Sequence, residues 1–231
     1  MNATTETNIY KPILFSTEMV QANLENRKNQ TRRICKVDAL AKLIGLYAKR
    51  RLWDRNIEEC PNPLGHFAKF ELDGVEMEVK SKFTVGDILW VRETFQESEC
   101  FDFQIKNQFV YKANEADFNF ATEHNVNWKP SLFMPKEAAR IFLKVTNVRC
   151  ERLQDISEED AIAEGAKDSL NRDDMKLLSN LDWVIKRPFG NHQFGFLALW
   201  QSINAKKHPW ESNPWVWVYE FEKIEKPENF I

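Results

Sequence analysis

The sequence has few of the features that identify the commonest enzyme classes. Its four cysteines include no CxxC pair, and none has the spacing to histidine that a zinc site requires. No glycine-rich dinucleotide fingerprint, phosphate-binding P-loop, GxSxG nucleophile motif or HExxH zinc motif is present. We therefore predict neither a metal nor a cofactor, and we do not expect a dehydrogenase, a P-loop enzyme, a serine hydrolase of the usual folds or a zincin.

Long apolar runs and an excess of positive charge are also absent. No segment approaches the length of a membrane span, and residues 1–10 are polar, without the apolar stretch of a secretory signal. We therefore expect a cytoplasmic protein with reduced thiols. The formal net charge of −3 argues against a non-specific binder of duplex nucleic acid, although it leaves room for a local basic site.

The chain does have size and many aromatic residues. Its 231 residues can build a full core, and eight tryptophans with 17 phenylalanines predict that this core is rich in aromatic side chains. Many short strand patterns with few helices between them predict the α+β class, as a small β-barrel with flanking helices and inserted segments. We expect a flexible arm over 1–10, one domain over 11–224 with insertions near 37–65 and 167–191, and a tail over 225–231.

Periodicity and turn residues predict the individual elements. Strands are expected over 13–16, 67–72, 75–79, 88–93, 108–113, 140–153 and 214–224, and helical segments over 17–26, 37–51, 135–139, 157–165 and 194–203. Asp73-Gly74 predicts a two-residue hairpin turn. Ser157 with Asp160 is typical of a capping box, and Gly165 is typical of a helix C-terminus. Residues 114–130 are expected to be irregular, and the last strand to be central and buried.

The most informative segment is a basic run over 27–36, which holds five basic residues and no acidic one. We expect it at the end of the first helix or in the loop that follows. Lys28 and Thr31 lie three residues apart inside it. Cationic crowding favours the neutral form of a lysine, and a neutral amine beside a hydroxyl can act as a base. The same run suits phosphate or a nucleotide, while a solvated helix end is the alternative without function.

Six blocks of sequence, in this order, resemble the ASCH domain of the PUA-like superfamily, and in particular ASCH proteins carried by phages and prophages. They are Lys11–Ser16, Arg27-Lys28-x-x-Thr31-x-Arg33, Gly86–Glu93, Met134–Arg140, Arg152–Ala161 and Asn213–Val218. The resemblance implies a small β-barrel with a cleft that takes RNA or a nucleotide-like ligand. The chain departs from it at Asn29, where the phage-type motif usually has threonine, and in being more than twice as long as the small bacterial members.

One branch of small bacterial ASCH proteins hydrolyses the acetamide of N(4)-acetylcytidine, with a lysine, a threonine three residues later and a glutamate on a helix after a late strand. By this resemblance Lys28, Thr31 and Glu164 are the catalytic residues, and Arg33 matches a further basic residue. Such a reaction needs a nucleophile, a base and a proton donor for the leaving nitrogen. Thr31 would attack or position a water, Lys28 would be the base, and Glu164 would shuttle the proton.

Further residues are candidates for ligand binding. Arg33 could hold the developing oxyanion or the nucleoside, and Glu93 is a second carboxylate that could replace Glu164. Arg140 could reach the cleft, although a structural strand cap is an equal alternative. The full set of ligand-binding candidates is Arg27, Arg32, Arg33, Glu93 and Arg140.

Three functions stay open at this point. The first is a module that binds RNA or a nucleoside or nucleotide ligand in a basic cleft. The second is an amidohydrolase acting on N(4)-acetylcytidine or a related N-acylated base. The third is a phage accessory protein that binds a host protein. The oligomeric state does not follow from the sequence.

Overall fold

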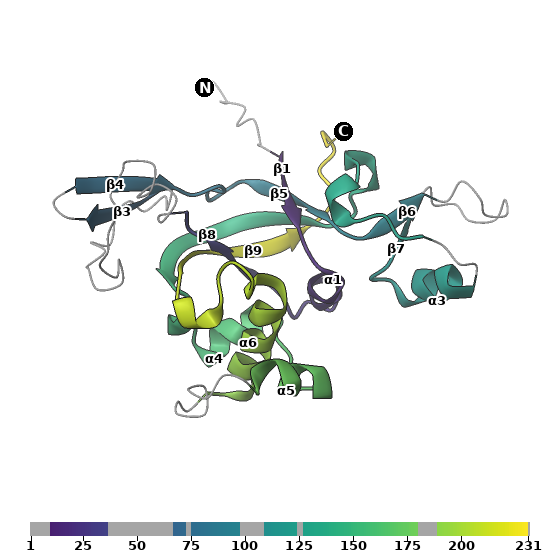
Figure 1. The fold of residues 1–231 in the computed structure, drawn as a ribbon. Coiled ribbons are helices and arrows are strands. Elements are labelled where there is room, and N and C mark those ends of the chain that lie inside the picture. The colour runs from purple at the N-terminus through teal and green to yellow at the C-terminus, as the bar shows by residue number, and fades with distance from the viewer. Residues whose placement is uncertain are drawn as a thin grey trace, which may run out of the picture. The chain divides into compact units, whose positions relative to one another are not determined.

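A computed structural model describes residues 10–36, 67–72, 75–97, 109–123, 127–179 and 189–230. They form a mixed α+β structure with a five-stranded sheet and five α-helices (Figure 1). The predicted helix over 37–51, the Asp73-Gly74 turn and most of the expected N-terminal arm lie outside them. None of the described helices has both the length and the apolar character needed to cross a bilayer.

The strands of the sheet follow the order β1-β5-β8-β9-β2. Their bounds are Tyr10–Leu14 for β1, Ile88–Arg92 for β5, Phe142–Arg152 for β8, Trp215–Ile224 for β9 and Gln30–Ile34 for β2. β1 pairs with β5 in parallel, whereas β5 with β8 and β2 with β9 are antiparallel. Two separate two-stranded antiparallel sheets pair β3 (Phe67–Leu72) with β4 (Val75–Lys80) and β6 (Phe95–Glu97) with β7 (Phe109–Tyr111).

The chain divides into two compact units. The first contains residues 1–29, 86–145 and 221–231. It includes β1, β5, β6, β7, α1 (Thr17–Leu24), α3 (Glu115–Glu123) and the short 3₁₀ turns η1 (Ser131–Phe133) and η2 (Lys136–Ala138). Its core joins apolar residues from the strands, these turns and the C-terminal segment: Ile88, Trp90, Phe95, Met134, Ala138, Ala139, Phe142 and Phe230.

The second unit contains residues 30–85 and 146–220. It includes β2, β3, β4, α4 (Glu158–Ala163), α5 (Arg172–Leu178), α6 (Asn191–Asn204) and the 3₁₀ turns η3 (Leu153–Asp155) and η5 (Trp210–Ser212). Its core packs the two α-helices α4 and α6 against β9, through Leu153, Ile156, Ala161, Ala166, Phe196, Leu197, Trp200, Trp210, Val216 and Val218. The aromatic character expected of the core is confirmed by the buried Trp90, Trp200, Trp210 and Trp217.

Two predictions of local structure are wrong. Residues 114–130, expected to be irregular, contain the helix α3. The basic run, expected at a helix end or in a loop, continues into the strand β2. Pairing with β9 overrides the weak strand propensity of this polar segment, because the backbone groups of β2 that face β9 then have ladder partners. The prediction that the last strand is central is confirmed, since β9 lies between β8 and β2.

Candidate functional site

The start of the basic run is a tight helix end in the first unit. α1 stops where Asn26 adopts a left-handed backbone with φ of 57°. The N–H of Arg27 then donates to the carbonyl of Ala22 at 2.8 Å, which closes the helix in a Schellman motif. Arg27 itself is exposed and pairs with the nearby Glu25 through its Nε at 2.7 Å. This ion pair is at the surface, so it adds little to stability.

Lys28 follows this turn and is buried, with 2% of its surface exposed. Its ammonium lies 5.5 Å from the centroid of the Phe15 ring, which is a cation–π distance. The side-chain amide of Asn23 donates to the Lys28 carbonyl at 3.1 Å and so fixes the backbone here. A lysine buried to this degree is uncommon in a protein, and the position is not the solvated helix end that a basic run usually forms.

The strand β2, in the second unit, sends alternate side chains to opposite faces of the sheet. Arg32 is on the face that carries Val216 and Val218, with its guanidinium carbon 5.6 Å from the ring centroid of Phe196 on α6. Thr31 and Arg33 are on the other face, where their antiparallel partners are Tyr219 and Trp217. The two faces of this strand therefore offer different chemistry.

The hydroxyl of Thr31 is fully buried and has no hydrogen-bond partner among the described residues. A buried hydroxyl without a partner costs about 1–3 kcal/mol in protein mutational data. The ring of Tyr219, directly across the strand pair, does not supply that partner, because its hydroxyl bonds the Ser81 hydroxyl at 2.8 Å. Thr31 therefore presents an unused donor and acceptor inside the second unit.

Glu164 ends the helix α4, also in the second unit. Ser157 caps the start of this helix by accepting the N–H of Asp160 at 3.0 Å. Gly165, with φ of 76°, closes the other end by donating to the carbonyl of Ile162 at 2.8 Å. Gly165 is thus confirmed as the helix terminator. The Glu164 side chain at this closed end is 2% exposed.

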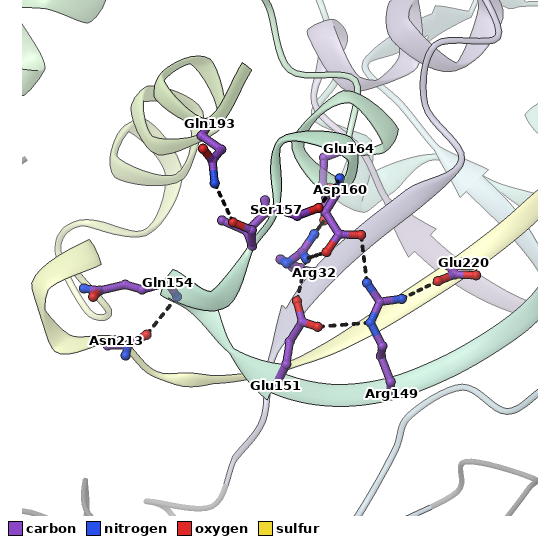
Figure 2. A network of polar contacts seen from close by, with 11 residues as sticks. Arg32, Arg149, Glu151, Gln154, Ser157, Asp160, Glu164, Gln193, Asn213 and Glu220 are labelled. Carbon is purple, nitrogen blue, oxygen red and sulfur yellow. Dashed lines mark hydrogen bonds and ion pairs between the residues drawn. The ribbon is translucent and has the colours of Figure 1, made fainter. Parts of the chain in front are cut away.

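The capping box predicted at the start of α4 has only one of its two bonds. Ser157 makes its half, but the carboxylate of Asp160 bonds two arginines, Arg32 and Arg149 (Figure 2). A carboxylate gains more from two guanidinium groups than from a single backbone N–H. Burial alone would raise the pKa of Asp160, but the charges of Arg32 and Arg149 outweigh it and hold that pKa below its ordinary value.

Arg32 bonds three carboxylates at once. Its Nη1 donates to Glu164 Oε1 at 3.3 Å, and its Nη2 donates to Glu151 Oε1 at 2.5 Å and to Asp160 Oδ2 at 2.8 Å (Figure 2). Arg149 on β8 adds bonds to Glu151, Asp160 and Glu220. Because the Arg32 side chain is only 1% exposed, it bonds protein carboxylates and leaves no surface for a phosphate.

Arg33 lies near the same carboxylate. Burial lowers the pKa of the Arg33 guanidinium from its ordinary value, and the opposite charge of Glu164 counteracts part of that effect. Arg33 is half-buried by surface exposure, so the second unit holds a cation beside both Glu164 and Tyr219. An arginine in such a place can stabilise a developing negative charge.

The other two predicted residues, Glu93 and Arg140, form a pair in the first unit. Arg140 donates through Nε and Nη2 to the two oxygens of Glu93, at 2.9 and 2.8 Å. The guanidinium also stacks on the Tyr111 ring at 4.0 Å from its centroid. Burial lowers the pKa of Arg140, but Glu93 more than compensates and raises it overall. Burial raises the pKa of Tyr111 to about 12.

The predicted residues thus fall into two groups. Thr31, Arg32, Arg33 and Glu164 belong to the second unit, and Arg27, Lys28, Glu93 and Arg140 belong to the first. The sequence reading missed Arg149 and Glu151. These two charges are spaced two residues apart on the long strand β8 and so share one face, which is the signal that could have indicated them. The described residues contain no group of side chains suited to a metal ion.

Comparisons with protein-family models, with curated proteins and with solved structures found no match for this chain.

Proposed function

We propose that this protein hydrolyses the amide of an N(4)-acylated cytosine nucleoside at a site built around Thr31 and Glu164. The observation that carries the proposal is the fully buried Thr31 hydroxyl, which has no hydrogen-bond partner among the described residues. Buried polar groups in proteins are almost always satisfied, and an unsatisfied one calls for an explanation such as a catalytic role or a missing ligand. Glu164, a buried carboxylate in the same compact unit, supplies the acid–base group that this chemistry needs.

The reaction requires one water and no oxidant. The bond between the acyl carbon and the exocyclic nitrogen breaks, the acyl carbon gains a hydroxyl from water, and the nitrogen leaves with a proton. Thr31 either attacks the acyl carbon itself or positions the attacking water, while Glu164 carries the proton to the leaving nitrogen. Arg33, half-buried near Glu164, suits the negative oxygen of the tetrahedral intermediate.

The resemblance to ASCH hydrolases adds Lys28 as the base. Only Asn29 and Gln30 separate Lys28 from Thr31 along the chain. Its burial, with 2% of its surface exposed, sets it apart from the solvated lysine of an ordinary helix end. The variant Lys28→Met tests this role.

The charges around Arg32 favour a neutral nucleoside over a polyanionic RNA backbone. The network of Figure 2 contains two guanidinium groups, Arg32 and Arg149, among the four carboxylates of Glu151, Asp160, Glu164 and Glu220. A phosphate close to this network would meet more negative than positive charge. An uncharged acylated base carries no such penalty.

We propose that the five-stranded sheet is the core of a PUA-like barrel. In support, five of the six ASCH-like blocks overlap β1, β2, β5, η2 and β9, and the sixth runs from the end of β8 through η3 into α4. An experimental structure tests this: a closed ring of strands is expected, and a sheet open at both edges would contradict it.

The test of function is release of acetate from N(4)-acetylcytidine, with cytidine quantified by chromatography. The wild-type protein should release both products, and Thr31→Val, Glu164→Gln and Lys28→Met should each lower the rate by about 100-fold or more. Glu159→Gln, on the exposed face of the same helix α4, is the matched control and should keep the wild-type rate. No product from wild-type protein at high enzyme concentration would reject the proposal.

A further inference from the structure

Four side chains of the second unit form a closed ring of alternating charge (Figure 2). Arg32 Nη2 bonds Glu151 Oε1 at 2.5 Å, and Glu151 Oε2 accepts from Arg149 Nε at 3.0 Å. Arg149 Nη2 then bonds Asp160 Oδ1 at 2.9 Å, and Asp160 Oδ2 returns to Arg32 Nη2 at 2.8 Å. Each carboxylate therefore bridges the two guanidinium groups with its two oxygens.

The ring connects elements that are far apart in the sequence. Arg32 comes from β2, Arg149 and Glu151 come from β8, and Asp160 comes from the first turn of α4. Arg149 also bonds Glu220 on β9. The residues Arg32 and Glu151 are 119 positions apart along the chain. These bonds therefore tie the helix α4 to the strand that carries Thr31.

Glu164 is attached to this ring but is not a member of it. Its bond to Arg32 Nη1 measures 3.3 Å, against 2.5 and 2.8 Å for the two ring bonds of Arg32 Nη2. The shorter bonds hold the guanidinium in place, and the longer bond uses the other terminal nitrogen, Nη1. Arg32 thus orients the Glu164 carboxylate while its main attraction goes to Glu151 and Asp160.

We infer that Arg32 is a positioning residue, held by the charge ring, that fixes the last turn of α4 and with it the Glu164 carboxylate. This inference rests on the proposed hydrolase function for its catalytic consequence. Its structural part, the restraint on α4, stands on the bonds of Arg32 to Asp160 in the first turn and to Glu164 at the end of the helix. A lysine cannot replace the arginine, because one ammonium has no planar fork to reach three carboxylates from two nitrogens.

Arg32→Lys is the variant that tests the inference, and Arg172→Lys, at the exposed start of α5, is the matched control. In the acetate-release assay Arg32→Lys should lower kcat by about 10- to 100-fold, as expected for a misplaced catalytic group, with KM within about two-fold. Arg149→Lys, which changes a more exposed member of the ring, should lower kcat by a smaller factor. A wild-type kcat in Arg32→Lys would overturn the inference.

Hydrogen exchange measures the restraint without substrate. The amides of Glu164, Gly165 and Ala166, which bond Asp160, Ile162 and Ala161 carbonyls, should exchange about 10-fold faster in Arg32→Lys and at the wild-type rate in Arg172→Lys. Unchanged exchange would overturn the inference. If the wild-type protein released no acetate, the proposed function would fail, and the exchange rates alone would then decide whether the ring restrains α4. If Arg32→Lys fails to fold, kcat and the amide exchange rates are measured on Arg149→Lys instead.

Discussion

Two buried carboxylates, one in each compact unit, are held by arginine in different ways. Glu93, in the first unit, receives a two-bond fork from Arg140 at 2.9 and 2.8 Å. Glu164, in the second unit, receives one bond at 3.3 Å from Arg32, whose other terminal nitrogen serves two further carboxylates. Both carboxylates are at most 2% exposed. The two carboxylates are thus similarly buried, but Arg140 gives both of these bonds to Glu93, whereas Arg32 divides its bonds among three carboxylates.

The difference separates a structural pair from a candidate catalytic group. A bidentate pair fixes both partners and uses the lone pairs that chemistry would need. Glu164, by contrast, is bonded at 3.3 Å by an arginine that also serves two other carboxylates, and it lies near Arg33, which suits a group that takes part in the reaction. We therefore assign Glu93 and Arg140 to stability, with Tyr111 stacked on the guanidinium, and we keep Glu164 for chemistry.

The largest effect on stability is expected at Glu93. Replacing Glu93 by Gln leaves Arg140 without its counter-charge and should lower the free energy of unfolding by about 2–3 kcal/mol. This is below the full cost of breaking a buried pair, because the Arg140 side chain is 26% exposed. Acetate release should stay within a few-fold of wild type. Urea unfolding measures the change in the free energy of unfolding, and the acetate assay measures the change in activity.

The matched control for that variant is Glu97→Gln, since Glu97 pairs with Lys129 at the surface of the same unit. Its cost should be below about 1 kcal/mol. If Glu93→Gln abolished acetate release while the protein stayed folded, the assignment of Glu93 to stability would be wrong.

A smaller effect of opposite sign is expected at Thr31. Thr31→Val removes a buried hydroxyl that has no hydrogen-bond partner in the described part of the chain and keeps the shape of the side chain, so the free energy of unfolding should rise by about 1 kcal/mol. Activity should fall at the same time. The control is Thr122→Val on α3, because the Thr122 hydroxyl already bonds the Phe118 carbonyl at 2.8 Å. A loss of stability in Thr31→Val would show that its hydroxyl does have a partner.

The smallest effect concerns pH. The folded pKa of Asp160 lies below its unfolded value, so its ion pairs contribute stability that is fully present above the unfolded pKa of about 4. That contribution is lost as the pH falls through the lower, folded pKa. The free energy of unfolding, measured with urea between pH 6 and pH 3, should therefore fall with pH, and it should fall less steeply in Asp160→Asn. An equally steep fall in the variant would mean that the charge ring does not stabilise the fold.

Sequence reasoning reached some of this structure and missed the rest for identifiable reasons. Gly165 could be predicted as a helix terminator because glycine readily adopts the positive φ that ends a helix. β9 could be predicted as a central strand because its own sequence places apolar residues on both faces. β2 escaped prediction, since its residues are polar and basic and only pairing with β9 makes them a strand. The charge ring was also unpredictable, because its members are brought together from β2, β8 and α4.

The candidate site shows the same division. The spacing of Lys28 and Thr31 and the place of Glu164 in its helix could be read from the sequence. That all three are buried could not, because lysine, threonine and glutamate are mostly exposed and their burial depends on partners elsewhere in the chain. The three-carboxylate environment of Arg32 likewise replaces the phosphate contact expected for a basic run.

The most direct test of this account is an amide chemical-shift titration of ¹⁵N-labelled Thr31→Val protein with N(4)-acetylcytidine. We predict saturable chemical-shift changes for the backbone amides of position 31, Arg33 and Glu164–Ala166. The amides of Glu93 and Arg140 should stay unchanged. Shifts confined to Glu93 and Arg140, or no shifts at β2 and α4 at millimolar ligand, would contradict the central claim that Thr31 and Glu164 mark the site.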